Sequence, residues 1–517
     1  KLLPDLIAIL AFIILSFAYF FPADIEGRIL FQHDTAAGVG AGQESKEYLE
    51  RTGERTRWTN SIFGGMSIYQ MSPSYDSTTS LKGVEKVYRL FLPDYVVLTF
   101  IMMLGFYILL RAFGISAWLA GLGGVIWAFS SYFFILIPAG HIWKFVTLAY
   151  IPPTIAGVVL AYRKKYLLGG IVTALFIALQ IQSNHIQMSY YFMFVILFFV
   201  GAYFEDAYKK KELPHFFKAS GVLALAAVVG VCINISNLYH TYEYSKETMR
   251  GKSELKQEGA AASQTSSGLD RDYITNWSYG IGETLTLLVP NVKGGGSGST
   301  MSQSEAAMAK ANPMYNGIYS QLPQYFGEQP WTAGPVYVGA FVMFLFVLGC
   351  FIVKGPLKWA LLGATIFSIL LSWGKNFMGL TDFFIDYVPM YNKFRAVSSI
   401  LVIAEFTIPL LAIFALKEIL NKPDTLKLKE NRGGVIATLV LTAGVALILA
   451  VAPGVSSSSF VTAQEIATLE QVLPAESRAQ HLAPIVANLT EMRKAIVASD
   501  AWRSFFIIVI GCLFLFL

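Results

Sequence analysis

Long apolar runs separated by polar stretches dominate the chain, and their lengths predict membrane-spanning helices. A span needs about 20 apolar residues, and that length selects about twelve candidate spans. The pattern therefore predicts an all-α polytopic membrane protein with a single membrane domain over residues 1–517. The candidate spans lie near residues 2–21, 94–110, 116–138, 145–161, 166–182, 187–204, 219–237, 335–353, 357–373, 398–416, 434–452 and 503–517.

Lys and Arg residues fall in the short loops on one side of the predicted bundle. Short basic loops stay in the cytoplasm, so we expect a multi-pass membrane protein with a cytoplasmic N-terminus. The four larger loops then lie outside. The basic positions are Arg111, residues 163–165 and 209–211, Lys218, Lys354, Lys358 and several within 417–432; the outer loops are residues 22–93, 238–334, 374–397 and 453–502.

Two of the outer loops contain recognisable local patterns. The stretch "KGGGSGST" at 293–300 is typical of a flexible linker. Apolar residues at helical spacing within 453–502 predict two amphipathic helices lying on the bundle or on the membrane surface.

Composition supports the membrane class. Hydrophobic residues make up 55% of the chain and charged residues only 14%, whereas a soluble domain carries about 25% charge. The chain opens on Lys1 and closes inside an apolar run, so we expect a longer polypeptide that continues beyond Leu517. The three cysteines lie in apolar runs and predict no disulfide framework. No P-loop, GxSxG, HExxH or CxxC motif occurs, and the short basic clusters give no indication of a nucleic-acid partner.

Polar residues with useful chemistry collect at the outer ends of the predicted spans. "FQHDTAAG" places His33 and Asp34 just beyond the first span, near headgroup depth. A carboxylate there can take a proton from a hydroxyl group or hold a divalent cation; alternatively it caps the next helix or is solvated. "AGHIWKF" places His141 and Lys144 in a short outer turn, where a pair of cations suits a phosphate.

Further candidates come from the other outer segments. Lys393 and Arg395 precede the tenth span, against the positive-inside trend. His185 lies in another outer turn, where a hydrogen bond between helices is the alternative reading. The remaining candidates are the carboxylates Asp270, Asp272 and Glu283, and the external aromatic residues Trp58, Tyr69, Trp277 and Trp331, for which an interfacial belt is the alternative reading.

Several of these segments together resemble the YfhO family of bacterial membrane proteins. "WTNSIFGGMSIYQ" at 58–70 resembles that family's Trp-Asn-Pro-x-x-x-x-Gly-Gly-Met-Pro stretch, with Ser61 in place of the Pro. The Asp34 loop, "GHIWK" at 140–144 and "PMYNKFRAVSSILVIAEF" at 389–406 look like further recurrent segments of the family. The family is similar to the GT-C superfamily of membrane glycosyltransferases.

The resemblance implies transfer of a sugar from a polyprenyl-phosphate-linked donor to an external acceptor, namely an envelope polymer, glycolipid or glycan. It implies that Asp34 is the catalytic carboxylate. The resemblance fixes neither a metal nor another cofactor, so we predict no cofactor. The alternative is Mg²⁺ or Mn²⁺ held between Asp34 and a second carboxylate. The competing functions are a transporter or flippase for a lipid-linked sugar or polymer, and a non-catalytic envelope-assembly scaffold. The donor phosphate is assigned to His141, Lys144, Lys393 and Arg395, and the sugar or acceptor to His33, Trp58, Tyr69, Asp270, Asp272, Trp277 and Glu283.

Overall fold

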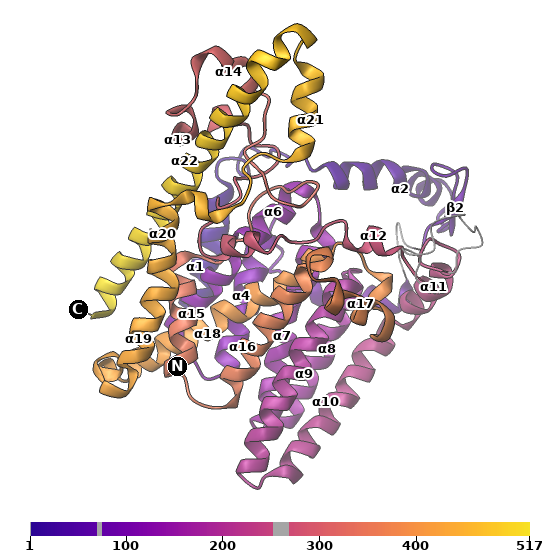
Figure 1. The fold of residues 1–517 in the computed structure, drawn as a ribbon. Helices are drawn as coiled ribbons and strands as arrows, with labels where there is room; N and C mark the ends of the chain where they lie inside the picture. Colours follow the sequence, from indigo (N-terminus) through magenta and orange to yellow (C-terminus); the bar gives the residue numbers. More distant parts are fainter. Residues whose placement is uncertain (1, 70–74, 252–267, 517) are drawn as a thin grey trace.

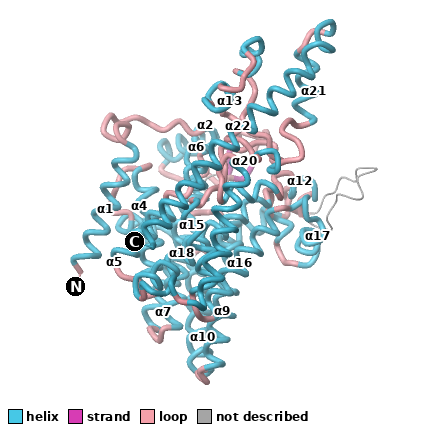
Figure 2. Tube along the Cα trace, turned by 60° about the vertical axis from the view of Figure 1, so that its left-hand side comes forward, coloured by secondary structure: helices cyan, strands magenta, loops and turns pink. Residues whose placement is uncertain are grey.

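The structure, a computed structural model, describes residues 2–69, 75–251 and 268–516, and it is built almost entirely of helices (Figure 1, Figure 2). The described strands are β1 (Trp58–Thr59) and β2 (Met66–Ser67), which pair antiparallel in the first outer loop. The prediction of a helical membrane protein is confirmed at this level. Residues 70–74 and 252–267 of the predicted outer loops lie outside the described residues.

Seven helical segments of the described chain are long and apolar enough to cross a membrane, and nine are when two bent pairs each count as one span. Three shorter apolar helices complete the bundle. Each predicted range falls on one of these segments, but the count of twelve spans remains a prediction. The seven are α1 (Leu3–Phe20), α7 (Ile142–Tyr162), α9 (Ile186–Lys209), α10 (Leu213–Ile233), α18 (Val402–Asn421) with its preceding turn, α19 (Arg432–Leu439) continued by α20 (Val445–Val451), and α22 (Ala475–Phe516). The bent pairs are α5 (Ala117–Ala128) with α6 (Ser131–Ala139), at 48°, and α16 (Pro356–Ser372) with the segment containing α17 (Met378–Tyr387), at 109°; the shorter helices are α4 (Val96–Ala112), α8 (Tyr166–Gln182) and α15 (Ala340–Ile352).

Helices α7 and α18 form the centre of the bundle. Their apolar windows are 94% and 89% buried, against 22% for α1. A helix that is apolar on all sides is expected at such a buried position. At the edge, Arg111 of α4 donates from Nε to Asp5 Oδ1 of α1 over 2.8 Å, which gives the carboxylate of the first span a structural role.

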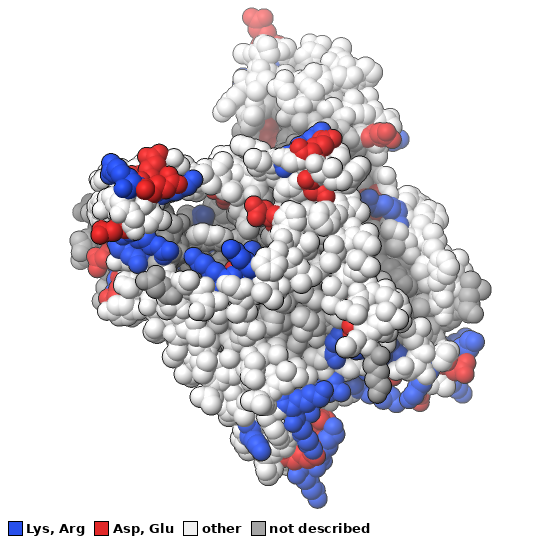
Figure 3. All heavy atoms as spheres, turned by 180° about the vertical axis from the view of Figure 1, so that it is seen from behind, with Lys and Arg blue, Asp and Glu red and all other residues white. Residues whose placement is uncertain are grey.

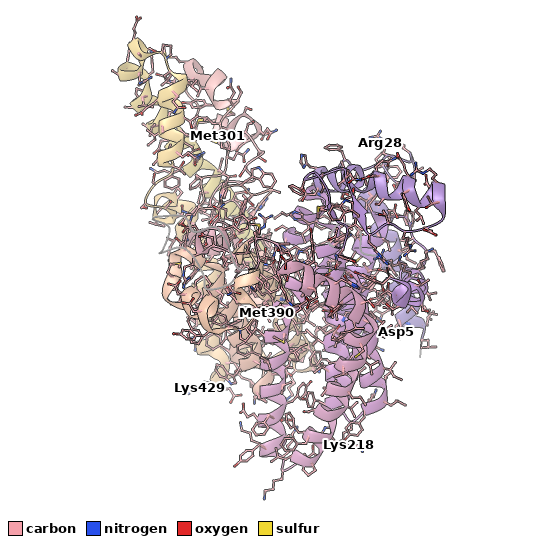
Figure 4. The ribbon with its side chains drawn as sticks, turned by 90° about the vertical axis from the view of Figure 1, so that its right-hand side faces the viewer. Asp5, Arg28, Lys218, Met301, Met390 and Lys429 are labelled. Carbon is pink, nitrogen blue, oxygen red and sulfur yellow. The ribbon has the colours of Figure 1, made fainter. Side chains whose placement is uncertain are left out.

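The basic loops and the large loops lie at opposite ends of the bundle. Lys218 and Lys429 mark one end, here called the basic end, and Arg28 and Met301 mark the other, the loop end (Figure 4). Lys and Arg side chains also gather at the basic end in the space-filling view (Figure 3). The segregation fits the predicted topology, while the side on which each end lies remains a prediction.

The loop end carries short helices and a projecting lobe (Figure 1). The lobe has its own apolar core, which includes Met301, Tyr319 and Leu489. Within it, the fully buried Arg493 donates to both carboxylate oxygens of Glu465. The helices of the loop end are α2 (His33–Thr52), α3 (Thr79–Tyr88), α11 (Ile235–Ser245), α12 (Arg271–Thr275), α13 (Glu305–Met308), α14 (Asn316–Tyr319) and α21 (Ala463–Val472).

Two outer segments differ from what the sequence pattern predicts. Helix α22 runs for 42 residues through the expected boundary near residue 502, because no helix breaker stands between the outer part and the last apolar run. The glycine-rich stretch at 293–300 is packed rather than linker-like. Gly294 has φ +81° and leaves no room for a Cβ beside the Gln324 carbonyl, and the Ser297 amide donates to Thr332 O over 2.8 Å.

Candidate functional site

The structure brings Asp34 against His141, two residues that the sequence separates widely. Helix α2 begins beside the turn between α6 and α7, where Gln32 Nε2 donates to Ile137 O over 2.6 Å. Asp34 Oδ2 then lies 3.1 Å from His141 Nε2. The helix cap is Gln32, and Asp34 occupies the first turn, so the capping alternative for Asp34 is wrong.

The turn that presents His141 depends on a glycine. Gly140 has φ +79°, a conformation that L-residues rarely adopt, and a Cβ there would lie 2.9 Å from the Thr35 amide nitrogen. The start of α2 can therefore approach the start of α7 closely. This contact places an acidic side chain at the head of a helix that carries Lys144 in its first turn.

The electrostatic surroundings of His141 favour its neutral form. Burial and the charge of Lys144 lower the pKa of His141 below its ordinary value, and Asp34 acts in the opposite direction. At neutral pH the contact with Asp34 is therefore a hydrogen bond from a neutral imidazole to a carboxylate. Such a bond can hold the carboxylate in one orientation without neutralising its charge.

Lys144 and His185 form the inner part of the site. Lys144 is 8% exposed; its Nζ donates to Ser399 Oγ over 3.0 Å and lies 5.2 Å from the centre of the Tyr132 ring. Burial, followed by the charge of Lys144, lowers the pKa of His185 to about 3. His185 Nδ1 is buried without a hydrogen-bond partner among the described residues, so the predicted hydrogen bond between helices is not made through this atom.

Lys393, Arg395 and Arg250 form the outer part. Arg395 Nη1 donates to the Tyr273 hydroxyl over 2.7 Å, with the guanidinium 5.3 Å from the ring centre. Lys393 Nζ donates to Arg250 O over 2.7 Å, and Arg250 Nε donates to Lys393 O over 3.1 Å. Sequence reasoning missed Arg250, although a basic residue in an outer loop is the same signal that marked Lys393.

The inner and outer parts together form what we call the cation cluster: Lys144, Arg250, Lys393 and Arg395. Within the part of the chain that the structure describes, none of these side chains makes an ion pair within 4.0 Å. Buried charges are normally paired, because leaving them alone is costly. Such a cluster is an arrangement suited to an anion.

The acidic candidates of the large loop have other partners. Asp270 caps α12 and accepts from the Asp272 and Tyr273 amides, while Asp272 is exposed. Glu283 is 2% exposed and accepts from the Gly280 amide over 2.6 Å and from a tyrosine hydroxyl over 2.5 Å. In the described residues no three His, Cys, Asp or Glu side chains gather in a group that could hold a metal ion.

The aromatic candidates are distributed over the loop end. Trp58 donates from Nε1 to Asn60, Trp277 donates to the Trp331 carbonyl, and Tyr69 stacks on His240 with ring centres 4.7 Å apart. His33 is largely exposed, with Nδ1 3.6 Å from Asp34 Oδ1. Among the described residues of this group, only His33 contacts Asp34.

A carboxylate that sequence reasoning missed, Glu44 of α2, explains the "WTNS" turn. Glu44 Oε2 accepts from Thr59 Oγ1 over 2.5 Å, from the Asn60 amide over 2.7 Å and from the Ser61 amide over 3.0 Å. These bonds, led by that of Thr59, lower the pKa of Glu44. A proline at position 61 would lack the N–H group, so Ser61 here completes the attachment of the hairpin to α2.

No protein-family profile, curated protein or solved structure matches this chain. The resemblance to the YfhO family therefore remains a prediction that rests on the quoted segments.

Proposed function

We propose that this protein is a membrane glycosyltransferase of the GT-C type, which moves a sugar from a polyprenyl-phosphate-linked donor to an external acceptor of the cell envelope. The observation that carries the proposal is the position of Asp34, in contact with His141 and next to a cluster of cations that lack carboxylate partners among the described residues. A base beside an anion site is the pairing that transfer from a glycosyl phosphate requires.

The proposed reaction assigns one task to each part of the site. The acceptor oxygen attacks the anomeric carbon and gives its proton to Asp34, while the bond from that carbon to the phosphate oxygen breaks. The electron pair leaves with the polyprenyl phosphate, whose charge grows as it departs. Lys144 and Arg395 stabilise that charge, since Arg and Lys bind phosphate through charge-assisted hydrogen bonds. His141 is a positioning residue that orients Asp34.

The lipid anchor of the donor accounts for the depth of the site. A polyprenyl tail stays in the bilayer, so its phosphate is held at the membrane surface. Lys144 lies in the first turn of the central helix α7, and Asp34 follows the first span after a short connection. Both residues are therefore expected at headgroup depth on the loop end.

A second candidate function, a flippase for a lipid-linked sugar, is favoured by the bent helix pairs. The breaks of 48° and 109° are the kind of discontinuity found at transporter substrate sites. The two functions differ chemically, because a flippase leaves the sugar–phosphate bond intact.

The test is reconstitution of the purified protein in liposomes with a panel of polyprenyl-phosphate sugars and envelope-polymer acceptors. We expect release of polyprenyl phosphate together with a mass increase of the acceptor. Movement of the intact lipid-linked sugar between leaflets, without release of polyprenyl phosphate, would reject the transferase and support the flippase.

A further inference from the structure

The outer part of the cation cluster holds two positive side chains together without an acidic partner among the described residues. Arg250 and Lys393 each donate to the other's backbone carbonyl, over 3.1 and 2.7 Å. This reciprocal arrangement fixes both groups. Both cations are thereby held by neutral carbonyl groups, which leaves their positive charges available to an anion.

Arg395 links the Arg250–Lys393 pair to the inner part of the site. It interacts electrostatically with His141 on one side and with Arg250 on the other. Its guanidinium is oriented by the Tyr273 hydroxyl and ring, while the opposite end of the cluster is set by Lys144 on Ser399. The cations therefore form a row, with Lys144 at one end and Arg250 and Lys393 at the other.

The charge of the row exceeds that of one donor phosphate. Among the described residues, the four cations Lys144, Arg250, Lys393 and Arg395 make no ion pair with a carboxylate, and the carboxylate of the site, Asp34, contacts His141 instead. A phosphodiester linking one sugar to one lipid carries about one negative charge. Lys144 is buried and Arg250 is partly buried, and such cations are costly without a partner, so a single phosphodiester at Lys144 leaves the Arg250 end of the row uncompensated.

We propose that the site binds two phosphate groups at once, one at Lys144 and Arg395 and the other at Arg250 and Lys393. The inference deepens the proposed function and rests on it for the inner phosphate, which belongs to the lipid donor. The second phosphate comes either from a diphosphate link in the donor or from a phosphate group in the acceptor. Either source presents the same chemistry to the Arg250 guanidinium, whose planar fork matches phosphate oxygens.

The test is a binding titration with the purified protein in detergent, using farnesyl phosphate, farnesyl diphosphate, and glycerol phosphate in the presence of saturating farnesyl phosphate. Wild-type protein should bind farnesyl diphosphate more tightly than the monophosphate, or should bind glycerol phosphate beside the monophosphate. The first result identifies a diphosphate donor and the second a phosphate-bearing acceptor.

Arg250→Gln should weaken the binding of that second phosphate by about 10- to 100-fold and leave farnesyl phosphate binding unchanged. Arg250→Lys keeps the charge and should recover part of the affinity. Arg432→Gln, at the exposed start of α19, serves as the matched control and should change nothing. A thermal melt of each variant separates a binding defect from a folding defect.

Two results overturn the inference. One is equal wild-type affinity for the two farnesyl ligands together with no binding of glycerol phosphate. The other is an equal loss of monophosphate and diphosphate binding in Arg250→Gln, which would indicate a single subsite. Because these titrations involve no sugar transfer, a protein that binds two phosphates but transfers no sugar would reject the proposed function and retain this inference.

Discussion

Replacing Asp34 by Asn tests the assignment of the catalytic base. The change removes the charge and the proton-accepting capacity but keeps the shape and one acceptor oxygen facing His141. A general base contributes about 10²–10⁴ in rate. We therefore expect Asp34→Asn to lose at least about two orders of magnitude in sugar transfer, with donor binding largely retained because the cations are untouched.

The expected effect on stability is much smaller. The Asp34 side chain is 57% exposed, and its partner His141 is 48% exposed. Exposed pairs of this kind contribute about 0–1 kcal/mol, and an acidic residue in the first turn of a helix adds about 0.3–1 kcal/mol. The variant should therefore fold normally and melt within a few degrees of wild type. Catalysis and folding should respond on clearly different scales.

The assay is transfer of labelled sugar from the polyprenyl-linked donor in liposomes, with a thermal melt in parallel. Glu305→Gln is the matched control, since Glu305 is an exposed carboxylate in the first turn of α13 in the lobe. It should transfer sugar at the wild-type rate. Wild-type transfer by Asp34→Asn would refute the base assignment, and a variant that fails to fold would refute the claim that Asp34 is structurally dispensable.

Three further predictions concern the rest of the molecule. The pKa of His185 is about 3 in the folded protein and 6.5 in the unfolded chain, so the unfolded chain binds more protons between these values and the free energy of unfolding falls as the pH drops below 6.5. By about pH 5 the loss is about 2 kcal/mol. His185→Gln should remove that part of the pH dependence in denaturation curves. Arg493→Met removes the fully buried guanidinium from Glu465 and from the Phe460 and Pro323 carbonyls. It should cost about 3–5 kcal/mol, measured as earlier unfolding of the lobe by protease sensitivity. In cells carrying a variant without native cysteines, an impermeant thiol reagent should label Met314→Cys and not Lys427→Cys, and labelling of Lys427→Cys alone would reverse the topology.

The helices could be predicted from the sequence because length and hydropathy decide them locally. The range predicted for α8, residues 166–182, agrees with its observed bounds Tyr166–Gln182. The break between α5 and α6 was missed, since only Ser130 and Ser131 interrupt the apolar run that ends at residue 138. At the bend, Ser130 contacts Glu405 and the Tyr337 carbonyl. Contacts with distant segments carry no signature in hydropathy.

The candidate site divides in the same way. Asp34, His141 and Lys144 could be chosen because ionisable residues within or directly beside an apolar run are costly and often functional. Their proximity in the fold could not be predicted, because it depends on the hydrogen bond from Gln32 to the Ile137 carbonyl, 105 residues away in the chain. Arg250 was overlooked because one basic residue in a long polar loop is common, and its role emerges from the reciprocal bonds with Lys393.

The most direct measurement is a density map of the protein in a lipid nanodisc with a non-hydrolysable polyprenyl-phosphate sugar. The proposed function predicts phosphate density within hydrogen-bond distance of Lys144 and Arg395, with the anomeric carbon of the sugar facing the Asp34 carboxylate. Phosphate density elsewhere in the bundle, or a sugar directed away from Asp34, would contradict it.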